Sequence, residues 1–258
     1  MKRVLFSQKR DWQANIVKRL ADSNYVPTFL PFHSTIVPDY DLVVPMTIQD
    51  IRVLQSDHAA LNGRRFLVPA PAALRLANVK TDFNAFLVAS GYARHLPRPP
   101  AAGEFPYILK KAVDESGANA VLVPDAAAEA RLLGDREQQK GYFRQAYVPG
   151  TDEYATHMLM CGRGLRFHAT VRYVFDQERF IHGRQHRYRS AAEFHDTPFL
   201  ALFTEILERM AFQGICCFDY KVDAGTPKIF ELNPRYGGSL TRFLARFMPA
   251  YESCFPRS

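Results

Sequence analysis

The order of apolar and polar segments over the first seventy residues predicts a small α/β domain. The pattern alternates between β-like runs and helical periodicity, and Pro69-Ala70-Pro71 ends it. Strands that alternate with helices form a parallel sheet. The expected elements are strand 3–7, helix 13–20, strands 26–32 and 41–46, helix 48–61 and strand 65–68.

The rest of the chain has an antiparallel α+β pattern, in which neighbouring strands are joined by short turns. A helix over 80–91 ends at Gly91, a typical helix terminator. A proline-rich joint at 96–100 follows. The further expected elements are strands 105–112 and 121–124, helix 125–133, strand 143–148, hairpin strands 154–161 and 166–175, helix 198–212 and strand 215–222.

One ten-residue run, from Phe230 to Ser239, carries the clearest candidate chemistry. On a strand, residues two apart share a face. Phe230 and Leu232 are therefore expected in the core, with Glu231 and Asn233 side by side on the other face. A carboxylate beside an amide oxygen suits Mg²⁺, which takes few protein ligands.

The preceding strand supplies a second carboxylate. A symmetric hairpin with Val222 opposite Lys228 places Asp219 directly opposite Glu231. Directly opposed side chains lie about 5 Å apart at Cβ. Two like charges in that position favour a cation between them. On pattern alone, a solvated pair at a hairpin end explains these residues equally well.

Composition narrows the class of protein. Hydrophobic residues make up 47% of the chain and charged residues 23%, as in an ordinary soluble globular protein. We find no stretch of 18 apolar residues, so no membrane span is expected, and the N-terminus resembles a first strand, not a signal peptide. The four cysteines lack zinc-ligand spacing and are expected as reduced thiols, which predicts a cytoplasmic protein.

The net charge of +7 and the pI near 9.3 raise the question of nucleic-acid binding. Apart from residues 182–189, however, the basic side chains are scattered, and no known nucleic-acid-binding motif accompanies them. We therefore expect no nucleic-acid partner. The positive excess is better explained by small anionic ligands or by solubility.

An Asp on one strand, Glu-x-Asn on the next, and then Pro-Arg with small residues resemble the metal-binding end of the ATP-grasp superfamily. Members join a carboxylate to an amine, or to another nucleophile, through an acyl phosphate. The resemblance implies that Asp219, Glu231 and Asn233 hold one or two Mg²⁺ ions, or Mn²⁺ in their place, against the ATP phosphates. It also implies that Arg235 neutralises the transferring phosphoryl group or a substrate carboxylate.

The same resemblance, which covers the chain from about Lys80 onward, implies a division into three parts. Residues 1–76 would form a leading α/β domain. Residues 77–148 would form the lid subdomain with its lead-in helix, and residues 149–258 the metal-binding α+β subdomain. ATP would bind between the last two.

Two lysines are implied as phosphate contacts. Lys80 stands at the head of a helix, where family members carry such a lysine, and Lys110 ends the first lid strand. Successive strand residues face opposite ways, so only one of Lys110 and Lys111 can point into the cleft. The spacing from the hydrophobic run favours Lys110. The loop 114–119 would cover the phosphates, although its two acids depart from the family's glycine-rich pattern.

The hinge between lid and core is implied at residues 145–150. Gln145, Tyr147 and Val148 would present their main chain to the adenine edge, with Gln145 at a position that is often acidic. An acidic residue beyond the glycine would bind the ribose hydroxyls. That residue is Asp152 or Glu153, and the segment from Glu153 to Thr156 favours Glu153.

The acceptor side is the least determined. Either Arg172 or the basic cluster at 184–189 could hold an acidic acceptor, and a solvated strand face explains both nearly as well. Cys217 occupies a position where some family members place a phosphate-binding arginine, which leaves that task to Arg235. No histidine in the sequence is spaced to activate this cysteine.

The expected function is ATP- and Mg²⁺-dependent ligation of a small carboxylate to an amine, with C–N bond formation. The alternative is a nucleotide-binding protein without ligase activity, a regulator or a partner subunit, which the thin phosphate loop and Cys217 favour. A homodimer that completes the cleft is a further expectation.

Overall fold

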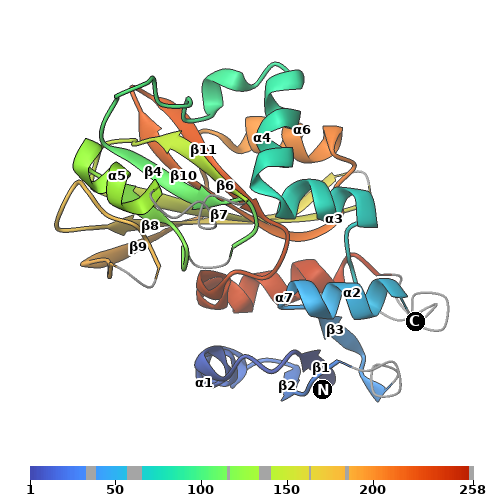
Figure 1. Ribbon diagram of the computed structural model, residues 1–258. Coiled ribbons are helices and arrows are strands. Elements are labelled where there is room, and N and C mark those ends of the chain that lie inside the picture. Colours follow the sequence, from blue (N-terminus) through green and yellow to red (C-terminus); the bar gives the residue numbers. More distant parts are fainter. Residues whose placement is uncertain are drawn as a thin grey trace.

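The computed structural model describes residues 1–32, 39–56, 66–114, 117–133, 141–162, 164–183 and 186–255. Within these ranges the chain forms three β-sheets with helices packed around them (Figure 1). The first is a parallel sheet in the order β2-β1-β3. Its strands and helices are β1 (Lys2–Phe6), α1 (Arg10–Leu20), β2 (Tyr25–Phe29), β3 (Leu42–Val44) and α2 (Ile48–Ser56).

Of the strand expected at 65–68, residue 65 lies outside the described residues, and residues 66–70 have no regular secondary structure. The reason is a tertiary contact. The backbone N–H of Leu67 donates to the hydroxyl of Tyr251 at 3.0 Å, and that hydroxyl donates to the carbonyl of Val43 at 2.7 Å. A distant side chain therefore satisfies the backbone group that a sheet would otherwise pair. Phe66 and Val68 still pack in the core beside Val43.

Two helices join the first sheet to the second. α3 (Pro71–Asn78) was not expected from the sequence, although Pro71 stands in its first turn, where the missing N–H costs nothing. α4 (Lys80–Ala89) was expected. Its C-terminus is a Schellman motif, in which Tyr92 N bonds Leu87 O at 2.8 Å and Gly91 adopts φ +84°. The expected boundary between the first two parts, at residues 76 and 77, falls inside α3. The three-part division remains a prediction.

The second sheet is antiparallel and lies in the segment that was expected to form the lid. Its strands are β4 (Tyr107–Lys111), β5 (Val121–Val123) and β6 (Tyr142–Ala146), in the order β5-β4-β6, with α5 (Ala126–Leu133) packed on them. Tyr107, Leu109, Val123 and Ala128 form its small core. The expected elements of this segment therefore form, with ends shifted by one or two residues.

The third sheet is antiparallel in the order β11-β10-β7-β8-β9. It separates two apolar clusters. One contains Ala155 and Val171 and packs against α7, α1 and the first sheet. The other contains Phe218 and packs against α4 and α6 (Figure 1). Its elements are β7 (Asp152–Cys161), β8 (Gly164–Val174), β9 (Ser190–Phe194), α6 (Leu200–Arg209), β10 (Gly214–Asp223), β11 (Thr226–Asn233), the 3₁₀ turn η3 (Gly238–Phe243) and α7 (Leu244–Glu252).

The β10–β11 hairpin differs from the expected symmetric one. Its turn consists of Ala224 and Gly225, both with positive φ, and Lys221, not Val222, lies opposite Lys228. A β-bulge at Phe230 then adds one residue on β11, so Asp219 does face Glu231. The bulge also moves Phe230 out of the core and into the lining of a cavity, while Leu232 stays buried.

Features outside the sheets agree with the sequence in part. In the part of the chain that the structure describes, no helix is long and apolar enough to cross a membrane. All four cysteines are free thiols. The helix expected at 198–212 begins at Leu200, two residues later than expected, as α6. The helix α7, the turn η3 and the strand β9 were not expected at all.

Candidate active site

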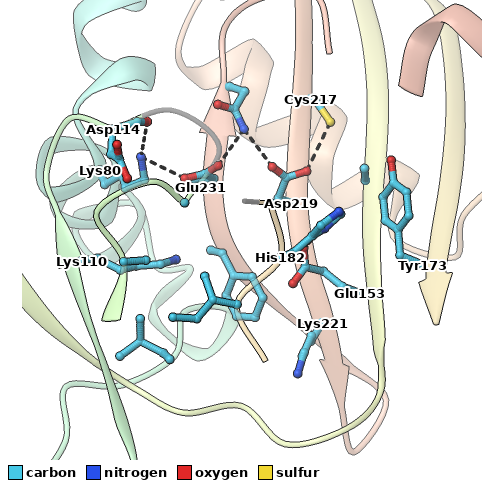
Figure 2. A pocket seen from close by; sticks show the side chains of 18 of the residues that line it. Lys80, Lys110, Asp114, Glu153, Tyr173, His182, Cys217, Asp219, Lys221 and Glu231 are labelled. Atoms are coloured by element: carbon cyan, nitrogen blue, oxygen red, sulfur yellow. Dashed lines mark hydrogen bonds and ion pairs between the residues drawn. The ribbon is translucent and has the colours of Figure 1, made fainter. Parts of the chain in front are cut away.

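A cavity of about 280 Å³ opens between the lid sheet and the large sheet. Side chains from β4 and β6 line one wall, and side chains from β7, β10 and β11 line the other (Figure 2). Trp12 from α1 and the segment 237–239 close one end. Residues of the second and third sheets and of α1, which packs on the first sheet, therefore line the cavity. Most residues expected at the site are among them.

Asp219 and Glu231 face each other in the middle of this cavity (Figure 2). The amide Nδ2 of Asn233 donates to Oδ2 of Asp219 and to Oε1 of Glu231, both at 2.9 Å. Burial and the charge of Glu231 raise the pKa of Asp219 to about 8. Burial also acts to raise the pKa of Glu231, but the charges of Lys80 and Lys110 outweigh it and hold that pKa at about 2.

The residues present fit Mg²⁺ or Mn²⁺. Burial and the facing carboxylate of Glu231 raise the pKa of Asp219, and a cation between the two carboxyls would favour the ionised form of both. Among the described residues no group of three or more His, Cys, Asp and Glu side chains is arranged to hold a metal. Two carboxylates, with the Asn233 amide turned to present its oxygen, are the sparse oxygen set that Mg²⁺ uses when phosphate and water complete its shell.

Two lysines approach the acidic pair, Lys80 from α4 and Lys110 from β4. Nζ of Lys80, at the head of α4, lies 2.9 Å from Oε2 of Glu231 and donates to the carbonyl of Asp114 at 3.0 Å. Nζ of Lys110 lies 4.9 Å above the ring of Phe230. The pKa of Lys110 is lowered overall. Burial and the positive charge of Lys80 lower it, and the negative charge of Glu231 opposes them. Lys110 is the inward lysine, and Lys111 is exposed at the rim.

The lid has more anchors than the sequence indicated. Ile108 and Ala120 of the lid pack with Ile181 of the C-terminal part. A Cβ on Gly117 would lie 2.8 Å from the carbonyl oxygen of His182, so the lid loop touches that segment directly. Of the expected phosphate loop, residues 115 and 116 lie outside the described residues.

The hinge presents buried polar atoms to the cavity. Gln145 and Tyr147 both line it, and the buried Nε2 of Gln145 has no hydrogen-bond partner among the described residues. Buried polar atoms without partners are uncommon and point to a missing ligand. The donors and acceptors of a nucleobase edge would satisfy them.

Lys221 supports this hinge and was missed in the sequence. It donates to the carbonyls of Val148 and Gly150 at 3.1 and 2.7 Å, and its Nζ lies 4.0 Å from the ring centroid of Phe180. Burial lowers the pKa of Lys221 to about 8. It shares a strand face with Asp219, two residues away, so period-two alternation could have found it. Val148 was expected to present its main chain to the adenine edge, but its carbonyl already accepts a hydrogen bond from Lys221.

Glu153, not Asp152, faces the cavity. Its Oε1 lies 2.6 Å from Nδ1 of His182. Burial acts to lower the pKa of His182, but the hydrogen bond and charge of Glu153 leave it raised. Asp152 instead lies 3.9 Å from Arg172, on the other face of the sheet.

The expectation that Arg172 is a catalytic residue does not fit its position. Its neighbour Tyr173 lines the cavity, and successive strand residues point to opposite faces, so Arg172 points away. The Arg172 guanidinium lies 5.8 Å from the ring of Phe194. Of the alternative cluster at 184–189, residues 184 and 185 lie outside the described residues, and 186–189 do not line the cavity.

One end of the cavity consists of residues that the sequence did not single out individually. Nε2 of His157 lies 2.7 Å from Oγ of Ser239, and Trp12, Gly237 and Gly238 complete the wall around Arg235. These residues come from α1, β7 and the segment after β11. His157 is on the cavity face of β7, with Glu153 and Ala155, so strand alternation was the available signal.

Burial makes His157 a determinant of acid stability. Desolvation lowers the pKa of His157 from 6.5 to about 3. Below pH 6.5 the unfolded chain binds a proton that the folded chain excludes, so stability falls as pH falls. From about pH 6 to about pH 4, we expect the unfolding free energy of the wild type to drop about 1.4 kcal/mol per pH unit more than that of His157→Gln.

Urea titrations across this pH range measure the difference. Replacing the exposed His195 with Gln is the matched control and should leave the wild-type slope unchanged. Equal slopes for the wild type and His157→Gln would show that His157 is protonated in the folded protein.

Comparisons with known proteins establish the fold. No family model and no curated protein matches the chain. Solved structures match over nearly its whole length. Phosphoribosylamine–glycine ligase from Thermotoga maritima has 14% identity and a TM-score of 0.68, with 97% of this chain and 75% of that chain covered. D-alanine–D-alanine ligase from Bacillus anthracis has 11% identity and a TM-score of 0.62, with 98% and 95% covered.

An L-amino acid ligase from Bacillus licheniformis also matches, with 13% identity, a TM-score of 0.61 and coverage of 95% of this chain and 70% of that chain. The matched enzymes are ATP-grasp proteins. The chain therefore has the ATP-grasp fold, with a parallel N-terminal sheet and two antiparallel sheets, and the fold prediction from the sequence is confirmed.

Proposed function

We propose that this protein is an ATP- and Mg²⁺-dependent ligase that activates a small carboxylate as an acyl phosphate and joins it to an amine. The observation that carries the proposal is the convergence of Lys80 and Lys110 on the carboxylates of Asp219 and Glu231 inside one cavity. The likeness to ligases of the same fold supports it.

In this proposal the cavity is divided along its length. Gln145 and Tyr147 contact the base, and Glu153 accepts hydrogen bonds from the ribose. Lys80 and Lys110 contact the phosphates. Asp219, Glu231 and Asn233 would hold Mg²⁺, which would supply positive charge to the phosphate oxygens. Arg235 binds the carboxylate substrate or the transferring phosphoryl group.

The proposed reaction balances without a protein nucleophile. A carboxylate oxygen bonds to the γ-phosphorus, the bond from that phosphorus to the β–γ bridging oxygen breaks, and ADP leaves. The amine nitrogen then bonds to the acyl carbon, the bond to the phosphate oxygen breaks, and the amine loses a proton to water. The chain contributes position and charge, which together provide most of the catalysis in phosphoryl transfer.

A release assay for ADP with paired carboxylates and amines tests the proposal. Turnover is expected only with ATP, a divalent cation and a matching acid. If ATP binds but no pair across a broad panel gives ADP, the alternative of a non-catalytic nucleotide-binding regulator or partner subunit replaces it. The observation that favours a non-catalytic protein is Cys217, which stands where some enzymes of this fold carry an arginine.

Nucleotide binding is also expected to close the lid further. Lys80 and Lys110 repel each other across the cavity, and a triphosphate supplies further negative charge between them. Amide hydrogen exchange over residues 105–114 and 117–125 should slow when a non-hydrolysable ATP analogue and Mg²⁺ are added.

Lys110→Ala should lose most of that added protection, whereas Lys111→Ala, on the exposed neighbour, should keep it. Full protection of the wild-type segment before nucleotide is added would show that the lid does not respond to the ligand. The anchors at Ile108, Ala120 and Ile181 set the starting level of protection in both variants.

A further inference from the structure

The end of the cavity beyond the acidic pair has its own construction. Its walls are Trp12 of α1, Tyr173 of β8 and Cys217 of β10, and its floor is the backbone of Gly237 and Gly238. The Trp12 and Tyr236 rings lie 5.9 Å apart between centroids, which fixes the indole against the loop. Four segments of the chain thus enclose one small space.

The floor leaves no room for a Cβ at Gly237 and little room for one at Gly238. A Cβ on Gly237 would lie 2.6 Å from Cε1 of His157, and a Cβ on Gly238 would lie 3.0 Å from Cε2 of Trp12. Neither glycine has positive φ, so close approach, not backbone strain, is the reason. The loop is therefore pressed against both rings, and the space left for a ligand is narrow.

Charge at this end is also restricted. The pKa of His157 is lowered to about 3 by burial, so its ring is neutral near pH 7 and serves to hold Ser239. Burial raises the pKa of Tyr173, and its phenol is neutral as well. Glu153 and His182 lie beside Tyr173 but pair with each other at 2.6 Å. Apart from them and the acidic pair, Arg235 is the one charged side chain among the described residues that line this end.

We propose that this end binds the carboxylate substrate and that the substrate is a small monocarboxylate with an uncharged, flat or short body. Its carboxylate would bind Arg235, and its body would lie against Trp12 above the Gly237–Gly238 floor. A second charged group on the substrate would lose its hydration here without a partner. This inference rests on the proposed ligase function and names the class of acid that it uses.

Trp12 is the single tryptophan of the chain, so its fluorescence reports directly on this end of the cavity. The test titrates the whole protein, saturated with a non-hydrolysable ATP analogue and Mg²⁺, with acids matched in size. Butyrate and benzoate have neutral bodies, succinate carries a second carboxylate, and 4-aminobutyrate carries an ammonium group. Butyrate and benzoate should change the fluorescence with a Kd at least about tenfold lower than those of the other two.

Two glycine variants localise the signal. In Gly238→Ala the added methyl group meets the Trp12 ring, and we expect weaker binding of benzoate than in the wild type. Gly164→Ala, where a Cβ would meet no atom within 4 Å, should bind as the wild type does. Equal effects of the two variants would place the acid elsewhere and overturn the inference.

Tighter binding of succinate or 4-aminobutyrate than of butyrate overturns the proposed substrate class. No fluorescence change with any acid overturns it too. The ADP-release assay then distinguishes a wrong substrate class from a wrong function. Turnover with an acid that carries a second charge would support the ligase proposal and contradict this inference.

Discussion

Replacing Glu231 with Gln should lower the rate of ADP release by at least about a hundredfold, with the fold intact. The side chain keeps its shape but loses the charge that pairs with Lys80 at 2.9 Å and that would bind the metal. Loss of a metal-binding carboxylate removes charge stabilisation that acts only while the phosphoryl group transfers. Steady-state release of ADP under saturating ATP and Mg²⁺ measures the effect.

Glu208→Gln is the matched control, since Glu208 is exposed on α6 and does not line the cavity. It should leave turnover unchanged. Circular dichroism and the thermal midpoint of Glu231→Gln should show a folded protein. Wild-type turnover in folded Glu231→Gln would remove Glu231 from the metal site.

Replacing Lys80 with Met should lower kcat/KM for ATP by about 10²–10³-fold. Lys80 is 7% exposed, and its Nζ has two partners, Glu231 and the carbonyl of Asp114. The change removes the proposed phosphate contact, and it also leaves the Glu231 carboxylate without its closest cation. Both losses act on the same step, so we expect kcat to fall and KM for ATP to rise.

The exposed neighbour of Lys110 provides the control for Lys80→Met. Lys111→Met removes a positive charge from the rim of the cavity and should change kcat/KM for ATP by no more than about twofold, the scale of an exposed ion pair. If both variants lose activity equally, a diffuse positive potential, and not a specific contact of Lys80, attracts the nucleotide.

The acidic hairpin was predictable because its chemistry and its alternation lie within one short stretch of sequence. Asp219 does face Glu231, although by a different route from the symmetric hairpin expected. The two-residue turn shifts the register by one, and the bulge at Phe230 restores it. Opposed carboxylates and a tight turn with Gly225 were visible in the sequence, whereas a bulge depends on packing around both strands.

Residues that depend on tertiary neighbours were not predictable. Arg172 was assigned to the site without knowing which face of β8 lines the cavity. Because Glu153 pairs with Tyr173, the cavity face of β8 carries Tyr173, and Arg172 points to the opposite face. Trp12 reaches the site only because α1 packs beside η3. Likewise, the hydroxyl of Tyr251 takes the backbone N–H of Leu67, so an apolar run that favours a strand forms none.

The most direct test of carboxylate activation follows an oxygen atom. Once the release assay has identified an acid, it is supplied with ¹⁸O in its carboxylate, together with ATP, Mg²⁺ and the amine. An acyl phosphate intermediate transfers one labelled oxygen to each inorganic phosphate released, and mass spectrometry of the phosphate detects it. We predict one ¹⁸O per phosphate in the wild type. Unlabelled phosphate accompanying product formation would contradict the proposed reaction.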